Sequence, residues 1–84
     1  MQQNKQLSPF SETSKTLCAG DVYKHYKGAL YKILGVARHS ESLEEMVIYE
    51  ALYGEHDVWV RPLSLFLEIL LLDGQIKPRF IKIS

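Results

Sequence analysis

The sequence predicts an all-β fold, a small SH3-like barrel of five to six antiparallel strands with a 3₁₀ turn after Pro62. Short segments rich in β-branched and aromatic residues recur from residue 22 to the C-terminal end, which is typical of strands. Glycine-containing turn sequences separate these segments. A proline then precedes a short apolar stretch, so a strand, a 3₁₀ turn and another strand follow one another as in SH3-like barrels.

The first hairpin is expected over residues 22–38, with a two-residue loop at Gly28 and Ala29. A glycine at the first of two loop positions is typical of a type II′ turn. This register places Tyr26 opposite Tyr31, and it therefore predicts an aromatic pair across the two strands.

Residues 40–53 fit two local structures. A capping box that begins at Ser42, followed by apolar residues at helical spacing, would suit a helix. Against a helix, Val47 and Tyr49 lie in a β-favouring stretch in which every second residue is apolar. We therefore predict a strand over residues 45–53.

The next strand is expected to return over residues 58–61, after a four-residue loop at 54–57. This register places Glu50 opposite Arg61 as an ion pair. The strand should end at Pro62, because proline has no N–H to donate, and a 3₁₀ turn with Pro62 at its first position should follow.

The last hairpin is expected from strands over residues 67–72 and 75–83. Asp73-Gly74 between them is a strong signal for a type I′ turn. The resulting register places Glu68 opposite Arg79. Residues 67–72 are apolar on both faces, so one face needs a cover, and a homodimer is one way to provide it.

Composition bounds the class of protein. The 84 residues suit one domain, with a flexible N-terminal extension over residues 1–19 and the β-domain over residues 20–84. Ten basic and ten acidic residues give a net charge of zero, so no global field attracts nucleic acid or an anionic membrane.

The one cysteine, Cys18, excludes an internal disulfide and a cysteine-rich zinc site, and it suits a cytoplasmic location. We see no signal peptide and no apolar run long enough to span a membrane.

Five short strings occur in order along the chain: HYKG at 25–28, ARHSE at 37–41, Tyr49 with LYG at 52–54, WVRP at 59–62 and PRF at 78–80. Together they resemble a bacterial family of small domains, the domain-of-unknown-function family 1653, over residues 20–83. The resemblance implies an SH3-like barrel in a bacterial cytoplasmic protein. It implies no activity, because none is established for that family.

The candidate ligand site combines six polar and aromatic residues, all of them from these strings: His25, Arg38, His39, Tyr49, Trp59 and Arg61. A β-fold needs alternating apolar residues and turn glycines, but it does not need these side chains in particular. Two cations and two imidazoles beside a tryptophan would suit an anionic ligand that also stacks. The leading hypothesis is thus a non-catalytic binding module for a peptide segment or a small anionic ligand, and the structural alternative pairs Arg61 with Glu50.

Two further hypotheses stay open. The basic hairpin over residues 22–38 could bind nucleic acid through its cations and tyrosines: Lys24, Lys27, Lys32, Arg38, Tyr23 and Tyr31. A small enzyme or metal site would instead lie around His25 and His39. No pair of histidines has a metal-ligand spacing, and neighbouring strand residues such as His39 and Ser40 point to opposite faces. We therefore expect no catalytic residue, no metal and no cofactor.

Overall fold

The structure is a computed structural model and describes residues 9–84. It contains two short helical turns and seven strands: η1 (Ser14–Thr16), β1 (Val22–His25), β2 (Leu30–Arg38), β3 (Glu45–Ala51), β4 (Val58–Pro62), α1 (Leu63–Phe66), β5 (Ile69–Leu72), β6 (Gln75–Pro78) and β7 (Phe80–Lys82).

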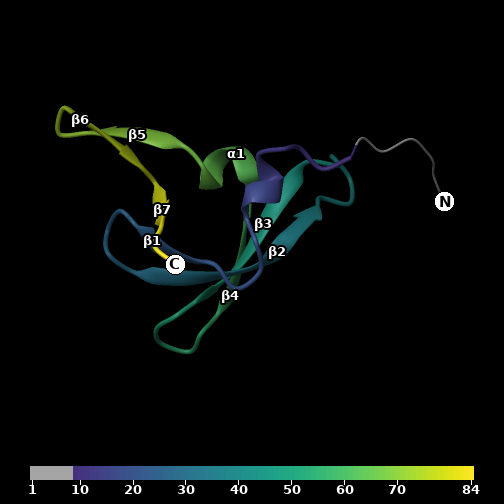
Figure 1. The fold of residues 1–84 in the computed structure, drawn as a ribbon, viewed down its shortest axis with the longest axis horizontal. Coiled ribbons are helices and arrows are strands. Elements are labelled where there is room, and N and C mark those ends of the chain that lie inside the picture. The colour runs from purple at the N-terminus through teal and green to yellow at the C-terminus, as the bar shows by residue number, and fades with distance from the viewer. Residues whose placement is uncertain (1–8) are drawn as a thin grey trace.

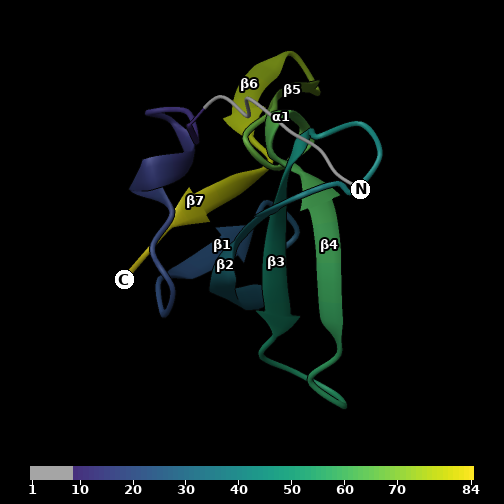
Figure 2. The same cartoon turned by 90° about the vertical axis from the view of Figure 1, so that its right-hand side faces the viewer.

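The strands form two antiparallel sheets, which confirms the all-β prediction. The larger sheet has the order β4-β3-β2-β1-β7, and β5 and β6 form a separate hairpin (Figures 1 and 2). The edge strands of the five-stranded sheet, β4 and β7, do not pair with each other in the described part of the chain. The sheet is therefore curved but does not close into the predicted barrel.

The first hairpin has a different register from the predicted one. Tyr23, not Tyr26, lies opposite Tyr31, and the N–H of His25 donates to the carbonyl of Ala29 at 2.8 Å. The loop thus has three residues and ends at Gly28, whose φ is +109°. The prediction placed Gly28 first in a two-residue loop. In a three-residue loop the residue with positive φ comes last, and Gly28 takes that position. The change directs both Tyr23 and Tyr31 to the inner face of the sheet.

The strand over residues 45–51 is confirmed, and the helical alternative is wrong. The predicted register between β3 and β4 is also wrong, because Arg61 lies opposite Val47 and Glu50 lies opposite Val58. The loop is longer than predicted, spanning 52–57, and both Gly54 and His56 adopt positive φ within it. A shift by an odd number of residues moves every side chain to the other face of the sheet. Arg61 therefore lies on the inner face and does not pair with Glu50.

The turn after Pro62 is one turn of α-helix, not the predicted 3₁₀ turn. The N–H of Leu67 donates to the carbonyl of Leu63 at 3.0 Å, which is the i to i−4 bond of an α-helix. Pro62 takes the N-cap position, with an extended backbone, and ends the edge strand β4.

The last hairpin has the predicted register around a turn in which Asp73 and Gly74 both have positive φ. Arg79 Nη2 lies 2.7 Å from Glu68 Oε1, as expected from that register. The predicted final strand, however, is divided at Arg79 into β6, which pairs with β5, and β7, which pairs with β1. The β5–β6 hairpin consequently projects from the rest of the molecule (Figure 1).

The core lies between the inner face of the curved sheet and α1. It comprises eight buried residues: Leu17, Tyr23, Ile33, Val47, Tyr49, Leu63, Phe66 and Phe80. Phe66 of α1 stacks on Phe80 of β7, with ring centroids 4.1 Å apart and planes at 7°. The rings of Tyr23 and Tyr49 approach Phe66 edge-on, at 5.4 and 5.2 Å. Phe66 thereby joins strands from both halves of the sheet.

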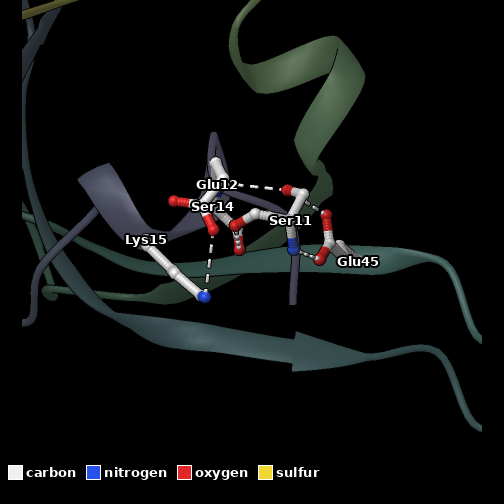
Figure 3. A network of polar contacts seen from close by, with 5 residues as sticks. All are labelled: Ser11, Glu12, Ser14, Lys15 and Glu45. Carbon is white, nitrogen blue, oxygen red and sulfur yellow. Dashed lines mark hydrogen bonds and ion pairs between the residues drawn. The ribbon is translucent and has the colours of Figure 1, made fainter. Parts of the chain in front are cut away.

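The N-terminal segment packs against the sheet from residue 10 onward. Glu45 at the start of β3 accepts hydrogen bonds from the Ser11 amide at 2.7 Å and from the Ser11 hydroxyl at 2.8 Å (Figure 3). Leu17 is only 6% exposed and belongs to the core. Part of the predicted extension, residues 1–8, lies outside the described residues, so its flexibility stays a prediction. No helix in residues 9–84 is long and apolar enough to cross a membrane.

Candidate functional site

Arg61 lies on the edge strand β4 and contacts side chains from two other strands of the five-stranded sheet. Its Nε donates to the hydroxyl of Tyr49 at 3.2 Å, and its Cζ lies 5.9 Å from the ring centroid of Phe80. Tyr49 comes from β3 and Phe80 from β7, so the guanidinium of Arg61 contacts side chains from both of these strands. Curvature of the sheet produces this contact, since β4 and β7 are four places apart in strand order.

The charge of Arg61 is not neutralised by a carboxylate in the part of the chain that the structure describes. Glu50, the predicted partner, lies near Lys32 at 3.7 Å and His56 at 3.1 Å. Arg61 is nevertheless half-buried. A cation that is partly removed from water without a counter-charge is unfavourable, so this position attracts an anion.

Tyrosine side chains form one wall beside Arg61. The hydroxyls of Tyr31 and Tyr53 are 2.8 Å apart, and the ring of Tyr31 lies edge-on to Tyr49 at 5.3 Å. Burial, followed by the hydrogen bond to Tyr53, raises the pKa of Tyr31 to about 12. The Tyr31 hydroxyl therefore stays protonated at neutral pH.

Trp59 extends this wall along β4. It lies opposite Tyr49 in the register and two residues before Arg61, so all three side chains are on the inner face. Trp59 is 51% exposed because β4 is an edge strand with no neighbour on its other side. An exposed indole beside a guanidinium offers a flat apolar surface and a planar donor together.

His25 lies on the other side of Phe80. Its ring is edge-on to Phe80 at 5.0 Å, and it packs against Tyr26 at 4.4 Å. Burial lowers the pKa of His25, and the positive charges of Arg79, Arg61 and Lys27 lower it further. Nδ1 accepts the N–H of Lys27 at 3.1 Å, so neutral His25 carries its proton on Nε2 as a donor.

Arg38 and His39 lie elsewhere. They follow the far end of β2, roughly 26 Å from its first residue at 3.3 Å per residue. Arg38 Cζ is 4.6 Å from the ring of Phe10, and His39 Nδ1 accepts the N–H of Glu41 at 3.1 Å within a turn. The structure thus brings His25, Tyr49 and Arg61 around Phe80, with Trp59 opposite Tyr49 on β4, whereas Arg38 and His39 lie at the end of β2 far from His25.

The same separation bears on the other two hypotheses. His25 and His39 are too far apart to share a metal ion, and no cluster of three His, Cys, Asp or Glu side chains suited to a metal occurs in residues 9–84. On the basic hairpin, Tyr23 is only 7% exposed and belongs to the core, so a base cannot stack on it.

Phe80 and Arg79 belong to this site although sequence reasoning did not select them. Phe80 contacts His25, Tyr49 and Arg61. Arg79 holds Glu68, and its buried Nε has no hydrogen-bond partner among the described residues. The PRF string was a signal for both residues, but the division of the last strand into β6 and β7 was needed to bring Phe80 next to β4.

Comparison with known proteins identifies the family. Residues 21–82 match the family described as "Protein of unknown function (DUF1653)". The chain belongs to the DUF1653 family. A crystal structure of a DUF1653 protein from Bordetella bronchiseptica is 33% identical, with a TM-score of 0.74, and the alignment covers 84% of this chain and 92% of that chain. A search of curated proteins found no match. The family resemblance expected from the sequence is therefore confirmed.

Proposed function

We propose that this DUF1653 chain is a non-catalytic binding module that recognises a peptide segment or a small ligand through an anionic group placed on Arg61. One observation carries the proposal: a half-buried guanidinium with no carboxylate partner in residues 9–84 lies at the open side of the sheet. SH3 domains also bind peptides next to exposed aromatic side chains. This comparison is an analogy of architecture and supports no particular ligand.

The geometry favours a carboxylate as the anionic group. The bond from Nε to the Tyr49 hydroxyl orients the guanidinium and leaves both terminal nitrogens for a ligand. Two parallel N–H donors match the two oxygens of a carboxylate. Trp59 and the half-exposed Tyr53 lie alongside, so an aromatic or apolar group attached to the carboxylate would stack there.

The test uses benzoate and its neutral analogue benzamide as probes, with amide signals of the ¹⁵N-labelled full chain as the readout. We expect saturable shifts near Arg61 with benzoate but not with benzamide. The affinity for benzoate should fall at least about tenfold in Arg61→Gln, equivalent to about 1.4 kcal/mol of binding free energy. The matched control is Lys32→Gln, which removes a cation from the outer face of the neighbouring β2 and should leave affinity within about twofold.

Trp59→Ala provides the second variant. Trp59 is half-exposed, so its removal should change the free energy of unfolding by no more than about 1 kcal/mol while weakening benzoate binding. Equal binding of benzoate and benzamide would contradict the proposal, and so would unchanged affinity in Arg61→Gln. Unfolding of the domain by Trp59→Ala would assign that residue to the structure rather than to the site.

A further inference from the structure

A separate cavity is formed by β1, β6 and β7, and its Lys24 and Ile81 lie on the face of the sheet opposite to Arg61. It has a volume of about 310 Å³ and is lined by Lys24, His25, Tyr26, Lys77, Pro78 and Ile81. Lys24 of β1 lies opposite Ile81 of β7 on this outer face, and β6 contributes the remaining wall. Two lysines and an imidazole line the cavity and no carboxylate does.

The distribution of ion pairs makes this cavity unusual. Residues 9–84 include six lysines, and three of them have a carboxylate within 4.0 Å: Lys15, Lys32 and Lys82. The three that have none are Lys24, Lys27 and Lys77. Lys24 and Lys77 line the cavity, and Lys27 Nζ lies 5.8 Å from the ring of Tyr26. The chain has no net charge, yet the lysines of the described part that lack a carboxylate partner all lie in or beside this cavity.

His25 is also part of the cavity lining. Burial lowers its pKa, and the positive charges of Arg79, Arg61 and Lys27 lower it further. The neutral ring has a proton on Nε2, so it offers a donor and no charge of its own. Strongly charged oxyanions suit such a set of point charges and donors, because a lysine ammonium binds phosphate without the planar geometry that arginine requires.

The rest of the lining indicates what the anion is attached to. The Tyr26 ring, Pro78 and Ile81 form an apolar wall beside the lysines. The cavity volume of about 310 Å³ is at the small end of ligand sites, so it suits a small molecule with a single ring. We propose that this cavity binds a small phosphate ester, with the phosphate between Lys24 and Lys77 and an aromatic or apolar group against Tyr26.

Arg61, which carries the proposed function, does not line this cavity, although His25 belongs to both sites. The test titrates the ¹⁵N-labelled full chain with phenyl phosphate. We expect saturable shifts at residues 24–27 and 77–81, and a dissociation constant raised at least about tenfold in the Lys24→Gln/Lys77→Gln double variant. The control Lys82→Gln changes a neighbouring lysine that pairs with Asp21 at 3.5 Å, so it should alter affinity by less than about twofold. Arg61→Gln should also leave this binding unchanged, which separates the two proposals.

Two outcomes would overturn the inference of a phosphate site: no saturable shift with phenyl phosphate, or equal affinity in the double variant. A third arm uses a thymidine oligonucleotide, since phosphate esters also occur in nucleic acid backbones. If the oligonucleotide binds at least about tenfold more tightly than phenyl phosphate and its affinity falls steeply with salt, the assignment to a small molecule is wrong.

Discussion

Phe66 links the two halves of the fold, and its removal should cost a large part of the domain's stability. Its side chain is 0% exposed, stacks on Phe80 and contacts Tyr23 and Tyr49 edge-on. Replacing a fully buried phenylalanine with alanine destabilises proteins by about 3–5 kcal/mol, through lost transfer energy and a residual cavity. An 84-residue domain has a total free energy of unfolding of about 4–13 kcal/mol. Phe66→Ala should therefore bring the domain close to unfolding.

The measurement is urea unfolding followed by far-ultraviolet circular dichroism and by the emission of the single tryptophan, Trp59. Leu65→Ala is the matched control, because Leu65 is the neighbour of Phe66 in α1 but is 44% exposed, and it should cost no more than about 1 kcal/mol. If Phe66→Ala does not fold, Phe66→Leu should keep the fold and lose about 1–3 kcal/mol, since ring contacts are worth about 0.5–1.5 kcal/mol each. A loss in Phe66→Ala equal to that in Leu65→Ala would refute the role of α1 in the core.

Two further predictions concern titrating groups. The amide and then the hydroxyl of Ser11 lower the pKa of Glu45, so this contact is stable above the unfolded pKa of about 4.3 and is lost as the pH falls through the lower folded value. We expect the Ser11 amide to lose protection from hydrogen exchange in two cases: in Glu45→Gln at neutral pH, and in the native chain at acidic pH. Unchanged protection in both cases would contradict this prediction. The pKa of Tyr31 is about 12, so its contribution to stability is complete below about pH 10 and is lost as the pH rises toward 12. Tyr53→Phe should lower the pKa of Tyr31 in an ultraviolet titration, and an unmoved pKa would show that the Tyr53 hydroxyl does not contribute.

Local signals in the sequence were sufficient for most of the strands and for one turn. Alternating apolar residues located β3 and favoured a strand over a helix there. Asp73-Gly74 determined the last hairpin, because both residues of a type I′ turn need positive φ and this dipeptide tolerates it. The register that brings Glu68 to Arg79 follows from this turn alone.

Longer loops were not determined locally. Gly28 and Gly54 both indicate a turn, but a glycine does not show at which loop position its left-handed conformation is used. In both hairpins the register therefore differed from the prediction by an odd number of residues, which exchanges the two faces of a strand. That exchange moved Arg61 from a surface pair with Glu50 to the inner face.

The residue types of the candidate site were visible in the sequence, whereas their grouping was decided by the tertiary structure. His25, Tyr49 and Arg61 meet because the sheet curves until side chains of β4 and β7 touch, and Phe80 reaches them only after the last strand changes partner at Arg79. Arg38 and His39 share the family strings but lie at the other end of a nine-residue strand. Sequence periodicity shows which face of a strand is apolar, because that pattern depends only on residues close together in the sequence. Curvature and strand order depend on packing between residues far apart in the chain, such as Phe66 on Phe80, and only the folded chain contains that information.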